Sequence, residues 1–182
     1  MRRIALTGGI ACGKSLAAQD LNDFGIQTLD ADDIVHELIP VEERRRLAQV
    51  VFRDPDARRR LEEKIHPLVR ARLQAWMNEG LQKGEAIRVA IIPLLFEVGW
   101  EKDYDEIWCL ASSRDVQIRR MMETRGYTKE EAEGRLAAQM DVKEKAVRAN
   151  HTIWNEGTPE ELRAALRKLI DLGSGAAKVP RG

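Results

Sequence analysis

The sequence predicts an α/β protein of three layers, with a parallel sheet flanked by helices. The first observation is its opening order: a short apolar run over 3–7, a glycine-rich loop, a helical pattern over 14–23, and a second apolar run ending at Asp30. The second is that apolar runs return at 86–92 and 106–111, alternating with helical stretches. Strands that alternate with helices pair in parallel, because each helix carries the chain back across the sheet.

The composition favours a soluble cytoplasmic protein without nucleic-acid or membrane partners. Its 182 residues include 30 basic and 30 acidic side chains, so no net charge draws it toward either partner. No stretch approaches the roughly 20 apolar residues that span a bilayer. Cys12 and Cys109 are too few for a disulfide framework, and the three histidines are too scattered for a zinc site.

The segment over 33–83 is predicted to be a helical insertion between two strands of the sheet. It is dense in charge, and it is expected to break at three prolines: Pro40, Pro55 and Pro67. One helix is expected to end at 50–52. Another presents a single apolar side, formed by Leu61, Ile65, Leu68 and Val69.

Two further helices are predicted after the strand at 106–111. Ser112 or Ser113 is the expected N-cap of the first, and Thr128 with Glu131 has the capping-box spacing of the second. The side chains of the first helix expected to pack inward are Val116, Ile118, Met121 and Met122.

The chain is predicted to close with a short strand over 151–155 and a helix that has Pro159 in its first turn. Residues 173–182 are expected to form a flexible tail. A single domain over 1–172 is therefore expected, with core segments 1–32, 84–112 and 150–172.

The loop between the first strand and helix, GGIACGKS at 8–15, has the spacing of a phosphate-binding loop. Its backbone N–H groups can converge on phosphate oxygens, helped by the helix N-terminus. Lys14 is expected to reach the β- and γ-phosphates of a nucleotide, and the Ser15 hydroxyl to ligate Mg²⁺. The strand and the helix stand where this mechanism requires them.

A phosphate loop alone does not distinguish a kinase from a GTPase or a motor ATPase. The chain has no N-K-x-D tetrapeptide to read guanine, and the strand over 86–92 ends at Pro93 rather than at an aspartate. The second carboxylate must then come from LDADD at 29–33. Because the first two strands are expected to be neighbours, this segment should lie beside the loop. One aspartate can accept a proton from a substrate hydroxyl, while another caps a helix.

Cys12 has two readings. At a helix N-terminus its thiol pKa could be lowered, which would make it reactive. Alternatively, it is an inert small residue whose backbone amide alone matters.

Six motifs occur in an order similar to that of the dephospho-CoA kinase family: IALTGGIACGKS at 4–15, DAD at 30–32, HP at 66–67, PLLFE at 93–97, RLAAQ at 135–139 and NEGT at 155–158. The resemblance covers nearly the whole chain. It implies a P-loop kinase fold like that of nucleoside-monophosphate kinases, with a helical acceptor-binding insertion over 33–83 and a helical lid over 113–149. It also implies transfer of the γ-phosphate of ATP to the ribose 3′-hydroxyl of dephospho-CoA, the last step of coenzyme A synthesis.

The resemblance also implies site residues. Catalysis is expected from Lys14, Asp32 and Arg120, with Ser15 on the metal. ATP is expected to be bound by Gly9, Ile10, Ala11, Cys12, Gly13, Lys14, Ser15, Leu16, Arg125, Arg135, Asn155 and Gly157. Dephospho-CoA is expected to be bound by Thr7, Asp32, His66, Pro93, Leu94, Leu95 and Glu97.

The chain departs from the family pattern in three places. The segment after DAD is shorter than usual, which is expected to trim the acceptor side. The spacing in RRMMETR leaves Arg119 and Arg120 as alternatives for one role. Ala11, Cys12 and Leu16 stand where glycine, serine and threonine are common, but backbone amides do the binding there.

Two other functions stay open from the sequence: another small-molecule P-loop kinase, or a nucleotide-binding regulator without catalysis. Lys14, Ser15 and Asp32 favour a kinase, since a protein that only binds nucleotide needs no such carboxylate. The oligomeric state is not predicted.

Overall fold

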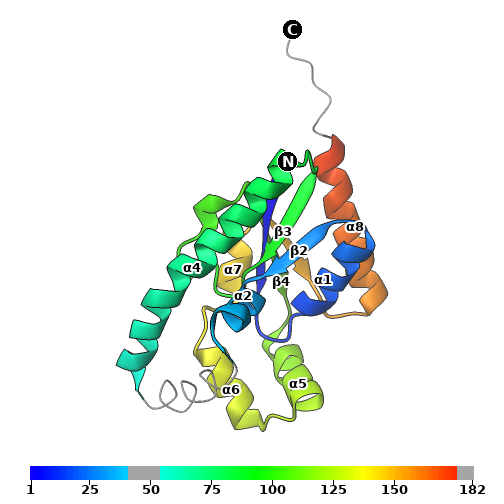
Figure 1. Cartoon of the computed structure of the whole chain (residues 1–182). Helices are drawn as coiled ribbons and strands as arrows, with labels where there is room; N and C mark the ends of the chain where they lie inside the picture. Colours follow the sequence, from blue (N-terminus) through cyan, green and yellow to red (C-terminus); the bar gives the residue numbers. More distant parts are fainter. Residues whose placement is uncertain (41–53, 176–182) are drawn as a thin grey trace.

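The computed structural model describes residues 1–40 and 54–175, with a five-stranded parallel sheet at its centre (Figure 1). The order across the sheet is β2-β3-β1-β4-β5. The strands are β1 (Arg2–Gly8), β2 (Gln27–Asp30), β3 (Ile87–Ile91), β4 (Glu106–Ala111) and β5 (His151–Trp154). The predicted α/β architecture is confirmed, and the expected strand over 106–111 coincides with β4.

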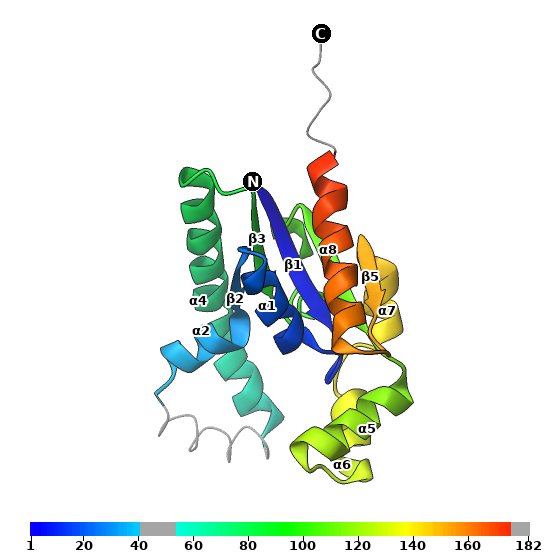
Figure 2. The same ribbon diagram turned by 90° about the vertical axis from the view of Figure 1, so that its right-hand side faces the viewer.

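Helices cover both faces of the sheet. The helices that flank it are α1 (Lys14–Asp23), α4 (Pro55–Gln82), α7 (Val142–Arg148) and α8 (Pro159–Gly175). Helices α1 and α8 pack together and lie in front of the strands in Figure 2, whereas α4 packs on β3 and α7 on β1 and β4. Alternation along β1 explains the two layers: Ile4 and Leu6 face the α1 and α8 side, while Ala5 faces the α4 side.

The remaining helices gather beyond the carboxyl ends of the strands. They are α2 (Ala31–Leu38), α5 (Arg114–Arg125) and α6 (Lys129–Ala137), while a short 3₁₀ turn, η1 (Glu101–Asp103), precedes β4. Figure 2 shows α2 on one side of this edge and α5 with α6 on the other. Ligands of parallel α/β sheets bind at this edge, so the fold places the site there.

The expectation that the first two strands are neighbours is wrong, because β3 pairs with both β1 and β2. The chain leaves β2 through the helical insertion and returns between the two strands. Since all three are parallel, their carboxyl ends still meet at one edge, and the segment after β2 stays on the same side as the phosphate loop.

Pro67 does not break a helix, contrary to expectation: α4 runs from Pro55 to Gln82 through it. A proline removes one backbone donor, but burial of Val69 and Leu73 on the same helix offsets that loss. Leu68 and Met122 were expected to pack inward, but they are 54% and 43% exposed and do not join the core. The expected helix end at 50–52 lies outside the described residues.

The predicted caps of α5 and α6 are present. Thr128 and Glu131 form the expected reciprocal capping box at the start of α6. Ser113 occupies the N-cap of α5 without a side-chain bond, while the Ser112 hydroxyl donates to the Asn155 carbonyl at 2.7 Å. Helix α8 continues to Gly175, three residues into the segment expected to be a tail.

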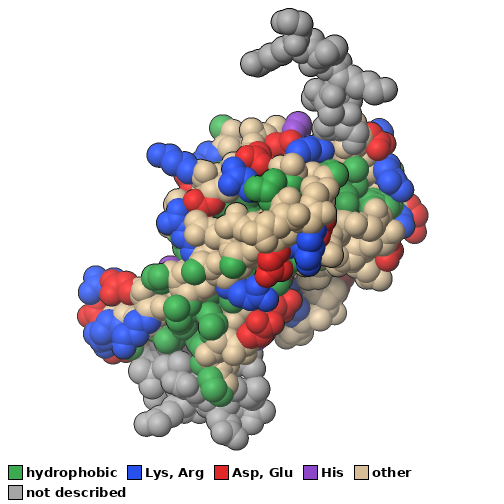
Figure 3. Space-filling view, turned by 45° about the horizontal axis from the view of Figure 1, so that its top comes forward, with side chains coloured by type: hydrophobic (Ala, Val, Ile, Leu, Met, Phe, Trp, Pro, Cys, Tyr) green, Lys and Arg blue, Asp and Glu red, His purple; other side chains and the backbone are tan. Residues whose placement is uncertain are grey.

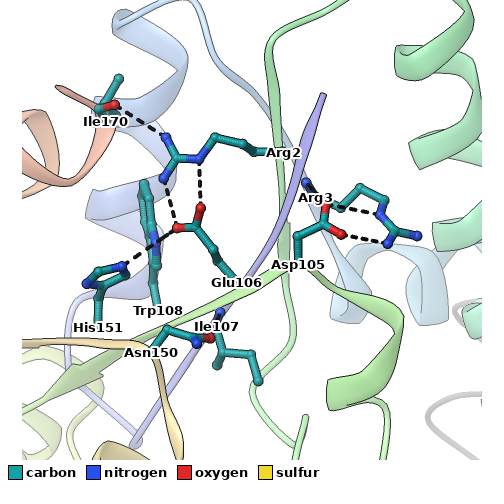
Figure 4. A network of polar contacts seen from close by, with 9 residues as sticks. All are labelled: Arg2, Arg3, Asp105, Glu106, Ile107, Trp108, Asn150, His151 and Ile170. Carbon is teal, nitrogen blue, oxygen red and sulfur yellow. Dashed lines mark hydrogen bonds and ion pairs between the residues drawn. The ribbon is translucent and has the colours of Figure 1, made fainter. Parts of the chain in front are cut away.

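The amino ends of β1 and β4 are joined by ion pairs (Figure 4). Arg2 makes two 2.8 Å bonds to the Glu106 carboxylate, and Arg3 approaches Asp105 at 2.7 Å. On the face in Figure 3, basic and acidic side chains are interspersed. None of the helices described is both long and apolar enough to cross a bilayer.

Candidate active site

The glycine loop between β1 and α1 follows a path that requires unusual backbone angles. Gly13 has φ of 95°, and Ala11 has φ of 58°, the only non-glycine with positive φ in the described part of the chain. A Cβ at Gly13 would lie 2.5 Å from the Asn155 side-chain nitrogen, so glycine is also required there for space. Ala11 costs about 1 kcal/mol in this conformation, which the contacts around the loop must offset.

Those contacts hold the carbonyls of the loop. Lys14 Nζ donates to the carbonyls of Gly8 and Gly9 at 3.1 and 2.8 Å. The next three carbonyls accept from side chains of other elements, in the order Gln117 to Ile10 at 2.8 Å, Arg120 to Ala11 at 3.2 Å and Asn155 to Cys12 at 3.0 Å. The outward-facing polar groups of the loop are therefore satisfied by protein.

Several backbone N–H groups of the same loop, unlike its carbonyls, have no partner in the described part of the chain. Within residues 1–40 and 54–175, the N–H groups of Ala11, Gly13, Lys14 and Ser15 donate to no acceptor, and α1 has no side-chain cap. Several free donors at a helix N-terminus form an anion-binding site, because the helix dipole adds to their attraction. The loop is organised to bind phosphate through its backbone.

Lys14 lies beside this cradle. Burial lowers the pKa of its ammonium group, while the nearby carboxylates of Asp32 and Asp30 favour the charged form. The acidic segment after β2 lies at the same carboxyl edge of the sheet as the loop.

One of the aspartates after β2 caps a helix, as expected. Asp30 is the N-cap of α2 and accepts from the Asp32 amide at 2.9 Å. Burial raises the pKa of the Asp30 carboxyl. The Asp32 side chain is exposed and lines a cavity, so it is available to a substrate.

That cavity has a volume of about 70 Å³, and we call it the acceptor cavity after the role that the sequence predicts for its residues. It brings together four of the predicted substrate-binding residues: Asp32, His66, Pro93 and Leu94. Its other walls are Ala31, Val35, Val69, Ile92, Val98 and Trp100. Asp32 and His66 are its ionisable side chains, and the His66 ring stands edge-on to Trp100 at 5.8 Å between centroids. An apolar cavity with few polar groups suits a ring-bearing acceptor.

Three predicted substrate residues do not line this cavity: Thr7, Leu95 and Glu97. Leu95 is fully buried in the core. Thr7 is also fully buried, and its hydroxyl donates to the Pro93 carbonyl at 3.2 Å. Thr7 thus ties β1 to the loop that follows β3.

Sequence reasoning missed Lys145 on α7, a fully buried lysine. Its Nζ lies 2.7 Å from the Pro93 carbonyl and 2.7 Å from the Glu97 carboxylate. Glu97 also accepts from the Met140 amide at 3.2 Å. The charged pair therefore joins the loop after β3 to α7, and the Met140 bond joins it to the chain between α6 and α7. The available signal was a lysine three residues after Val142, on the apolar side of a helix.

We predict that Lys145→Met raises the KM for the acceptor several-fold, with a much smaller effect on the KM for ATP. The loop carrying Pro93 and Glu97 loses its anchor, while the phosphate loop keeps its own contacts. Steady-state kinetics with each substrate varied measures this difference. Lys143→Met, on the exposed side of the same helix, is the matched control.

In a double-mutant cycle, Glu97→Gln should recover part of the stability lost in Lys145→Met, because it removes the unpaired carboxylate. Equal rises in the two KM values would contradict a positioning role for Lys145.

The predicted arginines are placed differently from one another. The Arg120 guanidinium contacts the loop at Ala11 and the Ser112 hydroxyl, both at 3.2 Å, whereas Arg119 is exposed. Arg135 stacks on the Tyr127 ring at 4.3 Å, and Arg125 is exposed at the end of α5. The structure thus brings Arg120 to the loop and leaves the other two predicted arginines in the α5–α6 region.

Asn155 and Ser112 support the loop from β4 and β5. The Asn155 side chain is 7% exposed and bonded to Cys12, so its amide serves the loop. Gly157 is exposed in the following turn, where a Cβ would collide with the Glu161 carboxylate.

The reactive reading of Cys12 is not supported. Its side chain is fully buried in the core, and burial raises the pKa of its thiol. The helix N-terminus does not overcome this desolvation. This favours the alternative interpretation, in which Cys12 is an inert small residue.

A phosphate-binding loop ahead of a helix, an arginine over that loop and an exposed carboxylate at the same sheet edge together define a P-loop kinase. The family model described as dephospho-CoA kinase matches residues 2–43 and 41–161. The chain belongs to the dephospho-CoA kinase family.

Comparison with individual relatives supports the same family. The chain is 38% identical to a dephospho-CoA kinase of Symbiobacterium thermophilum, over 90% of this chain and 78% of the relative. It is 36% identical to that of Geobacter sulfurreducens, over 93% and 97%. The latter alignment has 191 positions, more than this whole chain of 182 residues, so the relative contains residues that this chain lacks.

Solved structures share the fold. Dephospho-CoA kinase from Campylobacter jejuni superposes with a TM-score of 0.73 at 26% identity, covering 96% of this chain and 98% of that one. A shikimate kinase from Bacteroides thetaiotaomicron gives a TM-score of 0.59 at 17% identity, over 95% and 98%, and shares the fold alone.

Proposed function

We propose that this chain phosphorylates the ribose 3′-hydroxyl of dephospho-CoA with ATP, giving coenzyme A and ADP. The observation that supports the mechanism is the position of Asp32, which is exposed in the acceptor cavity at the same edge of the sheet as the phosphate loop with Lys14. The acceptor hydroxyl and the γ-phosphate can meet between these two groups. Membership of the dephospho-CoA kinase family supports the choice of substrate.

In the proposed step the Asp32 carboxylate accepts the proton of the 3′-hydroxyl. The oxygen forms a bond to the γ-phosphorus as the bond from that phosphorus to the bridging β,γ-oxygen breaks. ADP leaves with the electron pair of that bond. Lys14 and the free loop amides stabilise the charge on the transferring and leaving oxygens.

Mg²⁺ is the metal that the fold family implies, and the residues present fit it. The Ser15 hydroxyl is exposed at the start of α1, next to the free amides. No group of three or more acidic, histidine or cysteine side chains arranged for a metal occurs in the described part, which suits an ion held mainly by phosphates and water. We propose that Ser15 holds it, and that it neutralises phosphate charge when bound.

The lid arginines complete the proposal. The Arg120 guanidinium already donates to the Ala11 carbonyl of the loop, and from this position it can donate to a phosphoryl oxygen instead. Arg125 and Arg135 are proposed to reach ATP when α5 and α6 close over the loop, since such donors arrive on closure in phosphoryl transfer. Asn155 and Gly157 are proposed to border the adenine of ATP.

An ADP-release assay tests this function with dephospho-CoA, adenosine, shikimate and nucleoside monophosphates as acceptors. Dephospho-CoA is expected to be turned over with the highest kcat/KM. Faster turnover of another acceptor would replace the proposal by a different small-molecule kinase. ATP binding in calorimetry without turnover of any acceptor would indicate a regulator. A cytoplasmic location is proposed from the two free, buried cysteines.

A further inference from the structure

Gln117 is a buried polar side chain of α5 that the proposed mechanism does not use. It is 3% exposed, and its side-chain nitrogen donates to the Ile10 carbonyl of the phosphate loop at 2.8 Å. A carbonyl can only accept, so the group that contacts it is the NH₂ of the glutamine. Figure 2 shows α5 beyond the end of β1 at which this loop begins. The buried amide therefore acts on the backbone of the loop.

The carbonyl that Gln117 holds belongs to the same peptide group as the Ala11 N–H. The two point in opposite directions, because the peptide group is planar and trans. With the Ile10 carbonyl bonded to α5, the Ala11 N–H points away from α5, and it is one of the loop donors without an acceptor in the described residues. Gln117 thus sets the direction of a phosphate-binding donor without contacting phosphate itself.

The same peptide group lies beside a strained residue. Ala11 has φ of 58°, a region that is unfavourable for a residue with a Cβ. A half-turn of the peptide plane between Ile10 and Ala11 would bring this φ into the ordinary negative range. The carbonyl would then face the phosphates, and the N–H would turn away from them.

Packing does not oppose this half-turn. The side chains of Ile10 and Ala11 pack against Ile118 and Met121 in the cluster between α5 and α6. A turn of the peptide plane changes the ψ of one residue and the φ of the next, so it leaves both side chains in place. The hydrogen bond from Gln117 is the contact that the half-turn would break.

We propose that Gln117 is a positioning residue of the phosphate loop, which holds the strained peptide group between Ile10 and Ala11 in the orientation that binds the phosphates of ATP. This inference rests on the proposed function, since it concerns the binding of ATP. Arg120 holds the next carbonyl, that of Ala11, but it is proposed to leave it for a phosphoryl oxygen. Gln117 is uncharged and buried, so it keeps its contact with the loop.

Gln117→Leu removes the donor and keeps a side chain of similar size. The dissociation constant for ATP, measured by calorimetry, should rise about 5- to 10-fold, because only molecules with the Ala11 N–H turned inward are ready to bind. The KM for ATP should rise with it, while kcat at saturating ATP and the KM for dephospho-CoA stay the same. Glu123→Leu, at an exposed position of α5, is the matched control and should change none of these values. A fall in kcat with rises in both KM values would mean a general structural defect and would overturn the proposal.

A second background separates the peptide orientation from any other effect of the amide. Glycine adopts positive φ without strain, so the peptide group gains nothing by turning when Ala11 is replaced. In the Ala11→Gly background, Gln117→Leu should therefore raise the dissociation constant for ATP by less than about two-fold. An equal rise in both backgrounds would contradict the proposal.

Gln117→Met, which also lacks a donor, should give the same result and keeps the test open if Gln117→Leu does not fold. A crystal structure of either variant without nucleotide should show the Ile10 carbonyl turned toward the phosphate side. If the wild type binds no ATP, the proposed function itself fails. If the wild type phosphorylates dephospho-CoA and both variants bind ATP as tightly as it does, the positioning role fails while the function stands.

Discussion

Lys14→Ala should abolish phosphoryl transfer, with kcat reduced by at least about 10³-fold, the upper range for one preorganised donor at a developing charge. The loss should exceed that figure because Lys14 has a second task. Its ammonium group holds the carbonyls of Gly8 and Gly9, which keeps the loop amides turned toward the phosphates. Initial-rate measurements at saturating ATP give the fall in kcat.

Comparison with Lys14→Arg separates charge from geometry. A guanidinium retains the positive charge but places its donors differently. We expect it to recover ATP binding more than turnover, as measured by calorimetry and steady-state rates. Thermal unfolding of the variants shows whether the loop alone is affected. Turnover of Lys14→Ala near the wild-type rate would mean that the loop does not carry the transferring phosphate.

The sequence predicted the parts of the molecule that depend on local chemistry. The phosphate loop, the capping box at Thr128 and a capping aspartate within 29–33 each follow from a few adjacent residues, and the structure has them all, with Asp30 as the cap. A carboxylate beside the loop, from the segment after β2, was also predicted from local reasoning, whereas the choice of Asp32 among its aspartates came from the family resemblance. The premise about neighbouring strands was wrong, but the segment still lies at the same edge as the phosphate loop, because parallel strands share a carboxyl edge whatever their order.

What the sequence did not predict depends on contacts between distant segments. Lys145 meets Pro93 and Glu97 across about fifty residues of sequence, a contact that no local pattern encodes. The hydrogen bond from the Asn155 amide to the Cys12 carbonyl also joins distant segments, so it could not be predicted from local sequence. Cys12 was ambiguous because its helix N-terminus lowers a thiol pKa while burial raises it, and only the structure shows that burial prevails.

Asp32→Asn should lower kcat by about 10²–10⁴-fold, the usual contribution of one general base, and should leave the KM for ATP nearly unchanged. The substitution removes the proton acceptor but keeps a side chain of the same size in the acceptor cavity. The loop amides, Lys14 and Arg120 remain in place, so ATP still binds. Rates at saturating concentrations of both substrates, with ATP affinity from calorimetry, measure the two effects separately.

Its neighbours provide the controls. Asp33→Asn changes an exposed carboxylate one residue along α2 and should leave kcat unchanged. Asp30→Asn keeps a side-chain oxygen that can cap α2, so the fold should be retained. If Asp32→Asn were as active as the wild type and Asp30→Asn inactive, the base would be Asp30. The raised pKa of Asp30 would then suit it to proton transfer, and Asp32 would serve only to line the cavity.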